Sequence, residues 1–184
     1  MRSPERIYEE LLVLRAQRGD ERALRRLVAR WQPRLLAHAR RTSADPEAAA
    51  DAVQEAWLAI VRGLGRLDDA ACFPAWAYRI VTHKCADQAR RGARRREGDE
   101  AAAAPEQAGP DPAEEASRAD AQARLRQALR ALPPEQRAVL DLHYREGLGV
   151  REVAAALGIP AGTVKSRLHA ARQRLQALLE RSES

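Results

Sequence analysis

The stretch GVREVAAALGIPAGTVKSRLHAARQRL at residues 149–175 decides the fold of the C-terminal part of the chain. Its spacing predicts a short Ala-rich helix that ends at Gly158, a turn of a few residues, and a longer helix from Thr163 to about Leu179. We expect Thr163 to cap the longer helix, because its hydroxyl can accept a hydrogen bond from a free backbone N–H group. A short helix, a tight turn and a longer helix are the layout of a helix-turn-helix.

The longer predicted helix has one apolar face and one basic face. At about 100° per residue, its apolar side chains fall within about 60° of Val164 and form a stripe that should be buried. This stripe consists of Val164, Leu168, Ala171, Leu175 and Leu178. The opposite face carries donors and cations but no acid, namely Lys165, Ser166, His169, Ala170, Arg172 and Gln173. Such a face fits the major groove of DNA, although a solvated basic helix in an unrelated bundle has the same pattern. Arg167, at the edge of the stripe, is expected to contact a phosphate or to form an ion pair within the chain.

Charge is segregated along the chain. Residues 1–96 hold 20 Arg and Lys against 12 Asp and Glu, residues 97–120 hold 1 against 8, and residues 121–184 hold 11 against 6. Two basic ends suit a polyanionic partner such as nucleic acid. A GC-rich genome can explain the preference for Arg over Lys, but it does not explain this segregation.

Composition and periodicity predict an all-α protein of two small domains. Apolar residues make up 45% of the chain and aromatic residues 4%, and the apolar share consists largely of Ala and Leu, which favour helices. The predicted N-terminal bundle occupies residues 1–96, and the predicted helix-turn-helix domain occupies residues 119–184. Residues 97–118 are acidic, contain Pro and Gly, and have no bulky apolar side chain, which predicts a flexible linker.

About four helices are predicted in the N-terminal bundle. Asp20 is placed to cap the second helix, Asp45 stands at the start of the third, and Pro74 stands at the start of the fourth. Pro33 is expected to kink or split the second helix, because proline lacks a backbone N–H. Residues 65–73 are expected to form a loop. The predicted helices cover residues 5–18, 21–41, 46–64 and 74–96.

Several classes of protein lack support in the sequence. The N-terminal residues MRSPERIYEE have no apolar stretch of a secretory signal, and no run of about 18 apolar residues predicts a membrane span, so a cytoplasmic protein is expected. Cys72 and Cys85 form no CxxC pair and have no histidine at metal-ligand spacing, which favours reduced thiols over a redox or zinc site. No phosphate-binding glycine loop or Ser/His/Asp arrangement is visible. We therefore expect no enzyme, no cofactor and no metal.

The run LPPEQRAVLDLHYREGLGVREVAAALGIPAGTVKSRLHAARQRL at residues 132–175 resembles the C-terminal domain of the extracytoplasmic-function (ECF) RNA polymerase sigma factors. In that family this domain reads the minus-thirty-five promoter element. The resemblance implies that the recognition helix contacts DNA through Thr163, Lys165, Ser166, Arg167, His169, Arg172 and Gln173. Ala170 departs from the family pattern, because an arginine is common there, and this departure removes one expected DNA contact.

The N-terminal half carries the same resemblance independently. GDERALRRLVARWQPRLLAHAR at residues 19–40 resembles the family's opening helices. DAVQEAWLAIVRGLGRL at residues 51–67 resembles its polymerase-binding helix, which implies polymerase contacts by Asp51, Gln54, Glu55 and Trp57. Spacings of three and four residues place Asp51 near Gln54 and Glu55, although spacing alone would equally describe an ordinary exposed face. Ala50 and Ala52 depart from the acid and bulky aliphatic residue that are usual beside Asp51.

FPAWAYRIVTHKCADQARR at residues 73–91 resembles the helix that melts and holds the minus-ten element. The resemblance implies that the preceding loop selects a flipped base, with Asp68, Asp69 and Ala70 as candidates. The implied DNA contacts on the helix are Arg79, His83, Lys84, Gln88, Arg90 and Arg91. His83 stands where an asparagine is common. Trp76 could stack on a base or pack in the core, and its apolar neighbours favour the core.

Two functions remain after this reasoning. The leading one is an alternative sigma factor that binds core RNA polymerase and promoter DNA, both duplex and melted, without inserting into a membrane. An anti-sigma factor is a further candidate partner. The alternative is a stand-alone helix-turn-helix regulator, which would need a ligand-binding or dimerisation domain in place of the first half.

Overall fold

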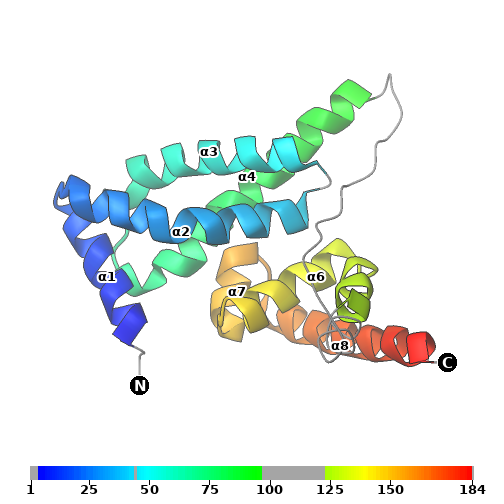
Figure 1. Ribbon diagram of the computed structural model, residues 1–184. Helices are drawn as coiled ribbons and strands as arrows, with labels where there is room; N and C mark the ends of the chain where they lie inside the picture. Colours follow the sequence, from blue (N-terminus) through cyan, green and yellow to red (C-terminus); the bar gives the residue numbers. More distant parts are fainter. Residues whose placement is uncertain (1–3, 44, 97–122, 184) are drawn as a thin grey trace, which may run out of the picture.

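The computed structural model describes residues 4–43, 45–96 and 123–183. Every regular element in these ranges is helical and none is a strand, which confirms the all-α prediction. Figure 1 shows two groups of helices, one from each half of the chain. The predicted linker at residues 97–118 lies outside the described residues.

Four long helices form the first domain (residues 4–96). They are α1 (Pro4–Gln17), α2 (Glu21–Thr42), α3 (Pro46–Gly63) and α4 (Phe73–Arg96). The segment between α3 and α4 contains two short 3₁₀ turns, η1 (Leu64–Arg66) and η2 (Ala70–Cys72), so the predicted loop is partly ordered as helix. The Asp20 carboxylate accepts hydrogen bonds from two backbone N–H groups at the start of α2, and Asp45 accepts one at the start of α3. Both predicted helix starts are therefore confirmed.

The core of the first domain is built around three aromatic rings. Trp31, Phe73 and Tyr78 are almost fully buried, and the Trp31 ring meets the other two in edge-to-face contacts with centroids 5.3 and 5.8 Å apart. Pro33 does not split α2, contrary to one expected outcome. Leu27 and Leu35, on either side of Pro33, are both fully buried, so each half of the helix is anchored on the same core.

The second domain (residues 123–183) contains the predicted helix-turn-helix. A helical segment at residues 123–130 is followed by α6 (Pro134–Leu140), a π-helical turn η3 (Asp141–Arg145), α7 (Val150–Leu157) and α8 (Ala161–Glu183). Helix α8 begins at Ala161, so Thr163 lies inside its first turn and the prediction that Thr163 caps the helix is wrong. Ala161 and Gly162, in front of Thr163, already belong to the helix, and the Pro160 carbonyl accepts the Val164 N–H.

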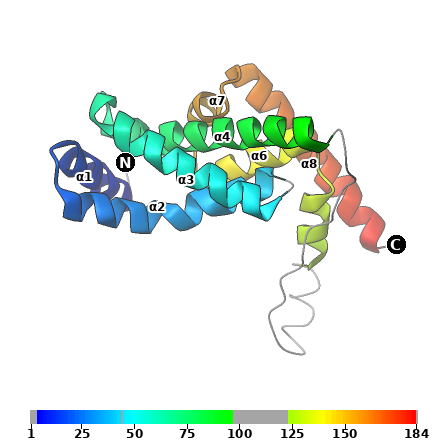
Figure 2. The same ribbon diagram turned by 90° about the horizontal axis from the view of Figure 1, so that it is seen from above.

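The two domains pack against each other, which the sequence did not predict. Helix α7 packs on α4, and α6 packs on α2. Figure 1 shows α6, α7 and α8 together below α2 and α4, and Figure 2 shows the same molecule from above. The helix-turn-helix thus lies beside the helix that was predicted to melt DNA.

Candidate nucleic-acid interface

Hydrogen bonds fix the turn of the helix-turn-helix. Gly158 adopts a φ of +67°, a left-handed conformation that would strain a side chain, and its N–H donates to the Ala154 carbonyl. The Ile159 N–H donates to the same carbonyl at 3.1 Å. At the start of α7, the Glu152 carboxylate accepts the Gly149 N–H at 2.7 Å. Hydrogen bonds therefore cap both ends of α7, and the turn at Gly158 sets the direction of α8.

The predicted division of α8 into two faces is confirmed. Val164, Leu168 and Ala171 are buried, and Leu175 and Leu178 are partly buried. Five of the expected DNA-contact residues are exposed, namely Lys165, Ser166, His169, Arg172 and Gln173. Thr163, Arg167 and Ala170 are half-buried. Arg167 forms no ion pair within the described residues, so the phosphate contact is the expectation that remains.

Arg172 is held in place by an aromatic residue that sequence reasoning missed. Its Nε donates to the Tyr144 hydroxyl at 2.8 Å, and its guanidinium carbon lies 5.7 Å from the centre of the Tyr144 ring. Tyr144 is 61% exposed and belongs to η3. An exposed tyrosine beside a cation of the outward face could have been suspected only once the two elements were known to meet.

An open hollow of about 410 Å³ lies on the outward side of α4. It is lined by Trp76, Arg79, Ile80, His83, Lys84 and Asp87. Trp76 is half-buried, and a Cβ atom added to Gly63 would lie only 3.0 Å from its ring. Trp76 therefore packs against α3 with one edge and borders the hollow with the other, whereas Tyr78 belongs wholly to the core.

Glu55 joins α3 to the cations of α4. Its carboxylate accepts hydrogen bonds from Lys84 Nζ at 3.0 Å, Gln88 Nε2 at 3.1 Å and Arg91 Nη1 at 3.2 Å. The Lys84 hydrogen bond holds the pKa of Glu55 below its ordinary value, and the charges of Lys84 and Arg91 act in the same direction. Glu55, which was expected to bind polymerase, therefore holds three residues that were expected to bind DNA.

Gln17 of α1 holds the segment that precedes α4. Its side-chain Nε2 donates to the carbonyl oxygens of Leu64 at 2.9 Å and Leu67 at 2.8 Å. Both distances are those of good hydrogen bonds. Sequence reasoning missed Gln17, because its partners lie 47 and 50 residues further along the chain.

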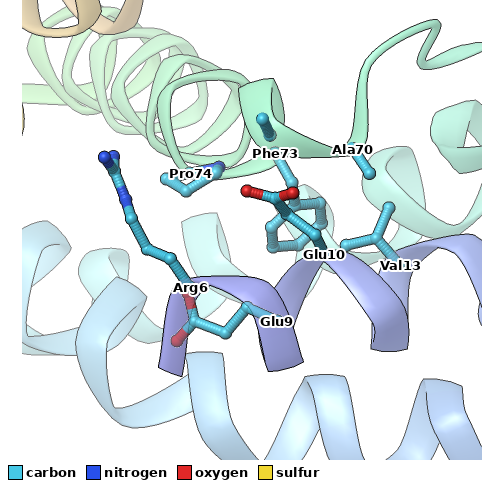
Figure 3. Close-up of a pocket in the computed structure, with 8 residues that line it drawn as sticks. Arg6, Glu9, Glu10, Val13, Ala70, Phe73 and Pro74 are labelled. Atoms are coloured by element: carbon cyan, nitrogen blue, oxygen red, sulfur yellow. The ribbon is translucent and has the colours of Figure 1, made fainter. Parts of the chain in front are cut away.

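The three loop residues expected to select a base differ in exposure. Asp68 and Asp69 are exposed, and the Asp69 carboxylate also caps η2 by accepting the Ala71 N–H at 2.9 Å. Ala70 is only 8% exposed. It lines a cavity of about 10 Å³ between η2 and α1, which is room for about one water molecule and not for a base (Figure 3). This corrects the expectation for Ala70, because its methyl group faces α1 and not the outer surface.

The face of α3 that was expected to bind polymerase is polar at one end and apolar at the other. Asp51 and Gln54 are exposed as expected, but Trp57 turns toward α2 and donates its ring N–H to the Gln32 side chain. Leu58 is 59% exposed and Val61 is 47% exposed. Positions 51, 54, 58 and 61 have the spacing of one helical face. We call these four residues the outer face of α3.

Cys72 is exposed and Cys85 is buried, and both are free thiols. Among the residues that the structure describes, no group of three or more His, Cys, Asp or Glu side chains could hold a metal ion. Within the same residues, no helix is both long enough and apolar enough to cross a bilayer.

Known protein families match both domains of the chain. The family model for sigma-70 region 2 matches residues 27–96, and the model for sigma-70 region 4 matches residues 122–175. The RNA polymerase sigma-H factor of Pseudomonas aeruginosa is 32% identical over 181 residues, covering 94% of each chain. The ECF RNA polymerase sigma factor SigM of Mycobacterium tuberculosis is 35% identical over 175 residues, covering 95% of this chain and 86% of the relative.

Solved structures show the same relationship. CnrH, in complex with the cytosolic domain of CnrY, is 28% identical with a TM-score of 0.66, covering 94% of this chain and 97% of CnrH. The sigma factor RpoE of Bartonella quintana, in complex with the anti-sigma factor NepR, is 26% identical with a TM-score of 0.66, covering 85% and 96%. With two matching regions and relatives aligned over nearly its whole length, the chain belongs to the sigma-70 family, among the ECF RNA polymerase sigma factors.

Proposed function

We propose that this sigma factor binds core RNA polymerase through the outer face of α3, reads the minus-thirty-five element with α8, and captures and helps to melt the minus-ten element with α4 and its preceding loop. One observation carries the proposal. The same chain presents an exposed, acid-free basic face on a helix-turn-helix and a hollow lined by cations and an aromatic ring on α4. Duplex recognition and capture of unpaired bases need these two different surfaces.

Helix α8 is suited to duplex DNA by its shape and charge. Lys165 and Ser166 lie in its first two turns, where a recognition helix reaches base edges in the major groove. Arg172 lies about two turns further along, where the helix passes phosphates. The hydrogen bond from Arg172 to Tyr144 orients the guanidinium before DNA binds.

Helix α4 is suited to single-stranded DNA. Arg79 and His83 are exposed beside the open edge of Trp76, so cations stand next to a surface on which a base can stack. Asp68 and Asp69 are the base-selecting candidates that remain on the surface of the loop. Because Asp69 also caps η2, we assign the direct base contact to Asp68.

The partners follow from the family and from the outer face of α3. We assign Asp51, Gln54, Leu58 and Val61 to the contact with core polymerase, which in a bacterium places the protein in the cytoplasm. CnrH and RpoE were each solved with a bound protein, and NepR is described as an anti-sigma factor. These relatives support an anti-sigma factor as a further partner of this chain. The chain's own role is binding and strand separation, and we assign it no chemical step.

In vitro transcription with purified core polymerase and a promoter library tests the proposal. The expected result is a set of transcribed promoters that share two short motifs, one near minus thirty-five and one near minus ten. Core polymerase without the protein is the control. Failure of the protein to form a stable complex with core polymerase, with retained binding to duplex DNA, would contradict the proposal and favour a stand-alone regulator.

A further inference from the structure

An exposed tyrosine and an exposed arginine from two different elements form a hydrogen-bonded pair on the surface of the second domain. Tyr144 lies on η3 and is 61% exposed, and Arg172 lies on the basic face of α8, 28 residues further along the chain. The Arg172 Nε donates to the Tyr144 hydroxyl at 2.8 Å, and the guanidinium carbon lies 5.7 Å from the centre of the tyrosine ring. We call these two residues the Tyr144–Arg172 pair.

The turn that carries Tyr144 is anchored on both sides. Leu142 and Leu148 are almost fully buried, and the Leu148 N–H donates to the Leu142 carbonyl at 3.0 Å, which closes the turn. The His143 ring makes an edge-to-face contact with the Tyr144 ring, with centroids 4.9 Å apart, and the His143 Nδ1 lies 2.8 Å from the Leu148 carbonyl oxygen. The tyrosine side chain is therefore exposed but held in one orientation, which lowers the entropy that it would lose on binding a ligand.

The pair has hydrogen-bond donors that the chain does not use. The Tyr144 hydroxyl accepts from Arg172, so its own O–H is left to donate. The guanidinium has further N–H donors on its two Nη atoms, and no group within residues 4–43, 45–96 and 123–183 accepts a hydrogen bond from them. A hydroxyl that accepts from a cation also becomes a stronger donor itself. Two donor groups side by side, with no acceptor between them, suit an anion with several oxygens.

The pair lies at a defined place along the recognition helix. At about 100° per residue, Lys165, His169 and Arg172 fall within about 60° of one another, so they form one exposed row along α8. Arg172 lies about 10 Å further along the axis than Lys165, because the rise is about 1.5 Å per residue. The major groove of B-form DNA is about 12 Å wide. When Lys165 reaches base edges inside the groove, the pair therefore comes to the wall of the groove, where the phosphates lie.

From these observations we infer that the Tyr144–Arg172 pair is a phosphate clamp for the minus-thirty-five duplex, in which the Tyr144 hydroxyl and an Nη group of Arg172 donate to the oxygens of one phosphodiester. A single carboxylate could use the same donors, but the basic row that continues to Lys165 favours an extended polyanion. Tyr144 is thus a DNA-contact residue that precedes the helix-turn-helix in sequence. The clamp reads no base and fixes the register of α8 on the duplex. The inference rests on the proposed function for the identity of this duplex.

The first test measures how tightly the complex with core polymerase binds a labelled duplex that contains the minus-thirty-five motif from the promoter library. Tyr144→Phe removes only the hydroxyl and should weaken binding about two- to tenfold, the usual effect of one lost hydrogen bond. Tyr8→Phe is the matched control, because Tyr8 is also exposed and lies on α1. Affinity in Tyr144→Phe equal to that of the parent, with an unchanged Tm, would overturn the inference.

Salt dependence separates the two members of the clamp. Arg172→Ala removes a charge and should lower the slope of log affinity against log salt concentration by about one, whereas Tyr144→Phe should lower the affinity and leave the slope unchanged. In the Arg172→Ala background, Tyr144→Phe should still weaken binding about twofold, because the hydroxyl keeps its own contact with the phosphate. No further loss in that background would show that the hydroxyl acts only by orienting Arg172, and it would overturn the inference.

The second test identifies the phosphate. Each phosphate of the duplex is replaced in turn by a neutral methylphosphonate, which removes the charge and one acceptor oxygen. At one position we expect the replacement to weaken binding of the parent about threefold or more and to add nothing to the loss in the Tyr144→Phe, Arg172→Ala double variant. Identical profiles of parent and double variant would overturn the inference alone. Failure of the parent complex to bind the duplex at all would contradict the proposed function, and the inference with it.

Discussion

Single residues on α8 can be compared in matched pairs. Lys165 is exposed on the basic face, whereas Arg174 is also exposed but lies outside that face on the same helix. We expect Lys165→Ala to weaken binding of the polymerase complex to minus-thirty-five duplex DNA about tenfold and to change promoter preference, because a base-edge or phosphate contact is lost. Arg174→Ala should have a much smaller effect. Fluorescence anisotropy with labelled duplexes measures both, and equal losses would show that α8 binds only through its total charge.

Gln17 gives a second prediction for a single residue. Gln17→Glu keeps the size of the side chain but replaces the amide donor by an acceptor that faces two carbonyl oxygens. We expect a loss of about 1–2 kcal/mol of stability, or a few degrees in Tm, together with weaker discrimination at the minus-ten element. Discrimination at the minus-thirty-five element should not change.

The measurement for Gln17 is transcription from paired promoter libraries that vary one element at a time. Gln17→Asn keeps the donor on a shorter side chain and should recover part of the minus-ten discrimination. A fall in stability with unchanged minus-ten preference would show that Gln17 supports the fold without positioning the loop.

These residues also show what the sequence could predict at this scale. The buried stripe of α8 followed from a helical repeat, which depends only on neighbours along one helix. The burial of Ala70 and the hydrogen bonds of Gln17 depend on α1 meeting the loop before α4, about 50 residues away. No local pattern contains that information. The same reason explains why Tyr144 was missed beside Arg172.

At the scale of elements, the two sides of α3 have different roles. Glu55 and Trp57 point to other elements of the first domain, so the outer face is left with Asp51, Gln54, Leu58 and Val61. We expect Asp51→Lys to lower the affinity for core polymerase at least tenfold through charge repulsion with a basic partner surface. Leu58→Ala should lower it by a similar factor and leave Tm nearly unchanged, because the side chain is 59% exposed.

Co-purification with core polymerase and a titration by fluorescence anisotropy measure these effects. Glu5→Lys on α1 is the control, because it makes the same change of charge at an exposed position away from α3. Normal polymerase affinity in both α3 variants would remove the outer face from the polymerase interface.

Element boundaries were largely predictable, and the exceptions have local physical causes. Asp20 and Asp45 mark helix starts because their carboxylates satisfy free N–H groups. Thr163 has the same capability, but Ala161 and Gly162 in front of it already join the helix. Pro33 leaves α2 whole because buried leucines anchor the helix on both sides of it.

At the scale of the whole molecule, the sequence predicted the two domains but not their contact. Segregated charge and an acidic middle segment predicted two basic domains joined by a flexible linker, and they carried no information on a contact between the domains. Three acids of the second domain, Asp141, Glu146 and Glu152, form ion pairs with arginines of the first domain beside the apolar core that the domains share. The net charge of the second domain, with eleven cations, hides such a placement. Family resemblance assigned functions to faces of single helices, and it gave no information on which faces of the two domains meet.

The contact between the two domains should weaken in acid, because Asp141 of the second domain pairs with side chains of the first domain. Groups that face its carboxylate are His38 and Arg41 on α2, Tyr78 on α4 and Arg145 on η3. Burial alone would raise the pKa of Asp141, but the hydrogen bonds and charges of His38 and Arg41 lower it below the ordinary 3.8. A carboxyl group with a depressed pKa stabilises the contact that it belongs to above its ordinary pKa, and this stabilisation is lost as the pH falls through the depressed value. We therefore expect fluorescent dyes attached at the exposed positions Ala29→Cys on α2 and Ala177→Cys on α8 to move apart below pH 3.8 while circular dichroism still reports helix. In Asp141→Asn the pair should already be further apart at pH 6 and should change less on acidification, because the group that titrates is gone. An equal response of parent and variant would assign the acid sensitivity to other carboxylates and remove Asp141 as its cause.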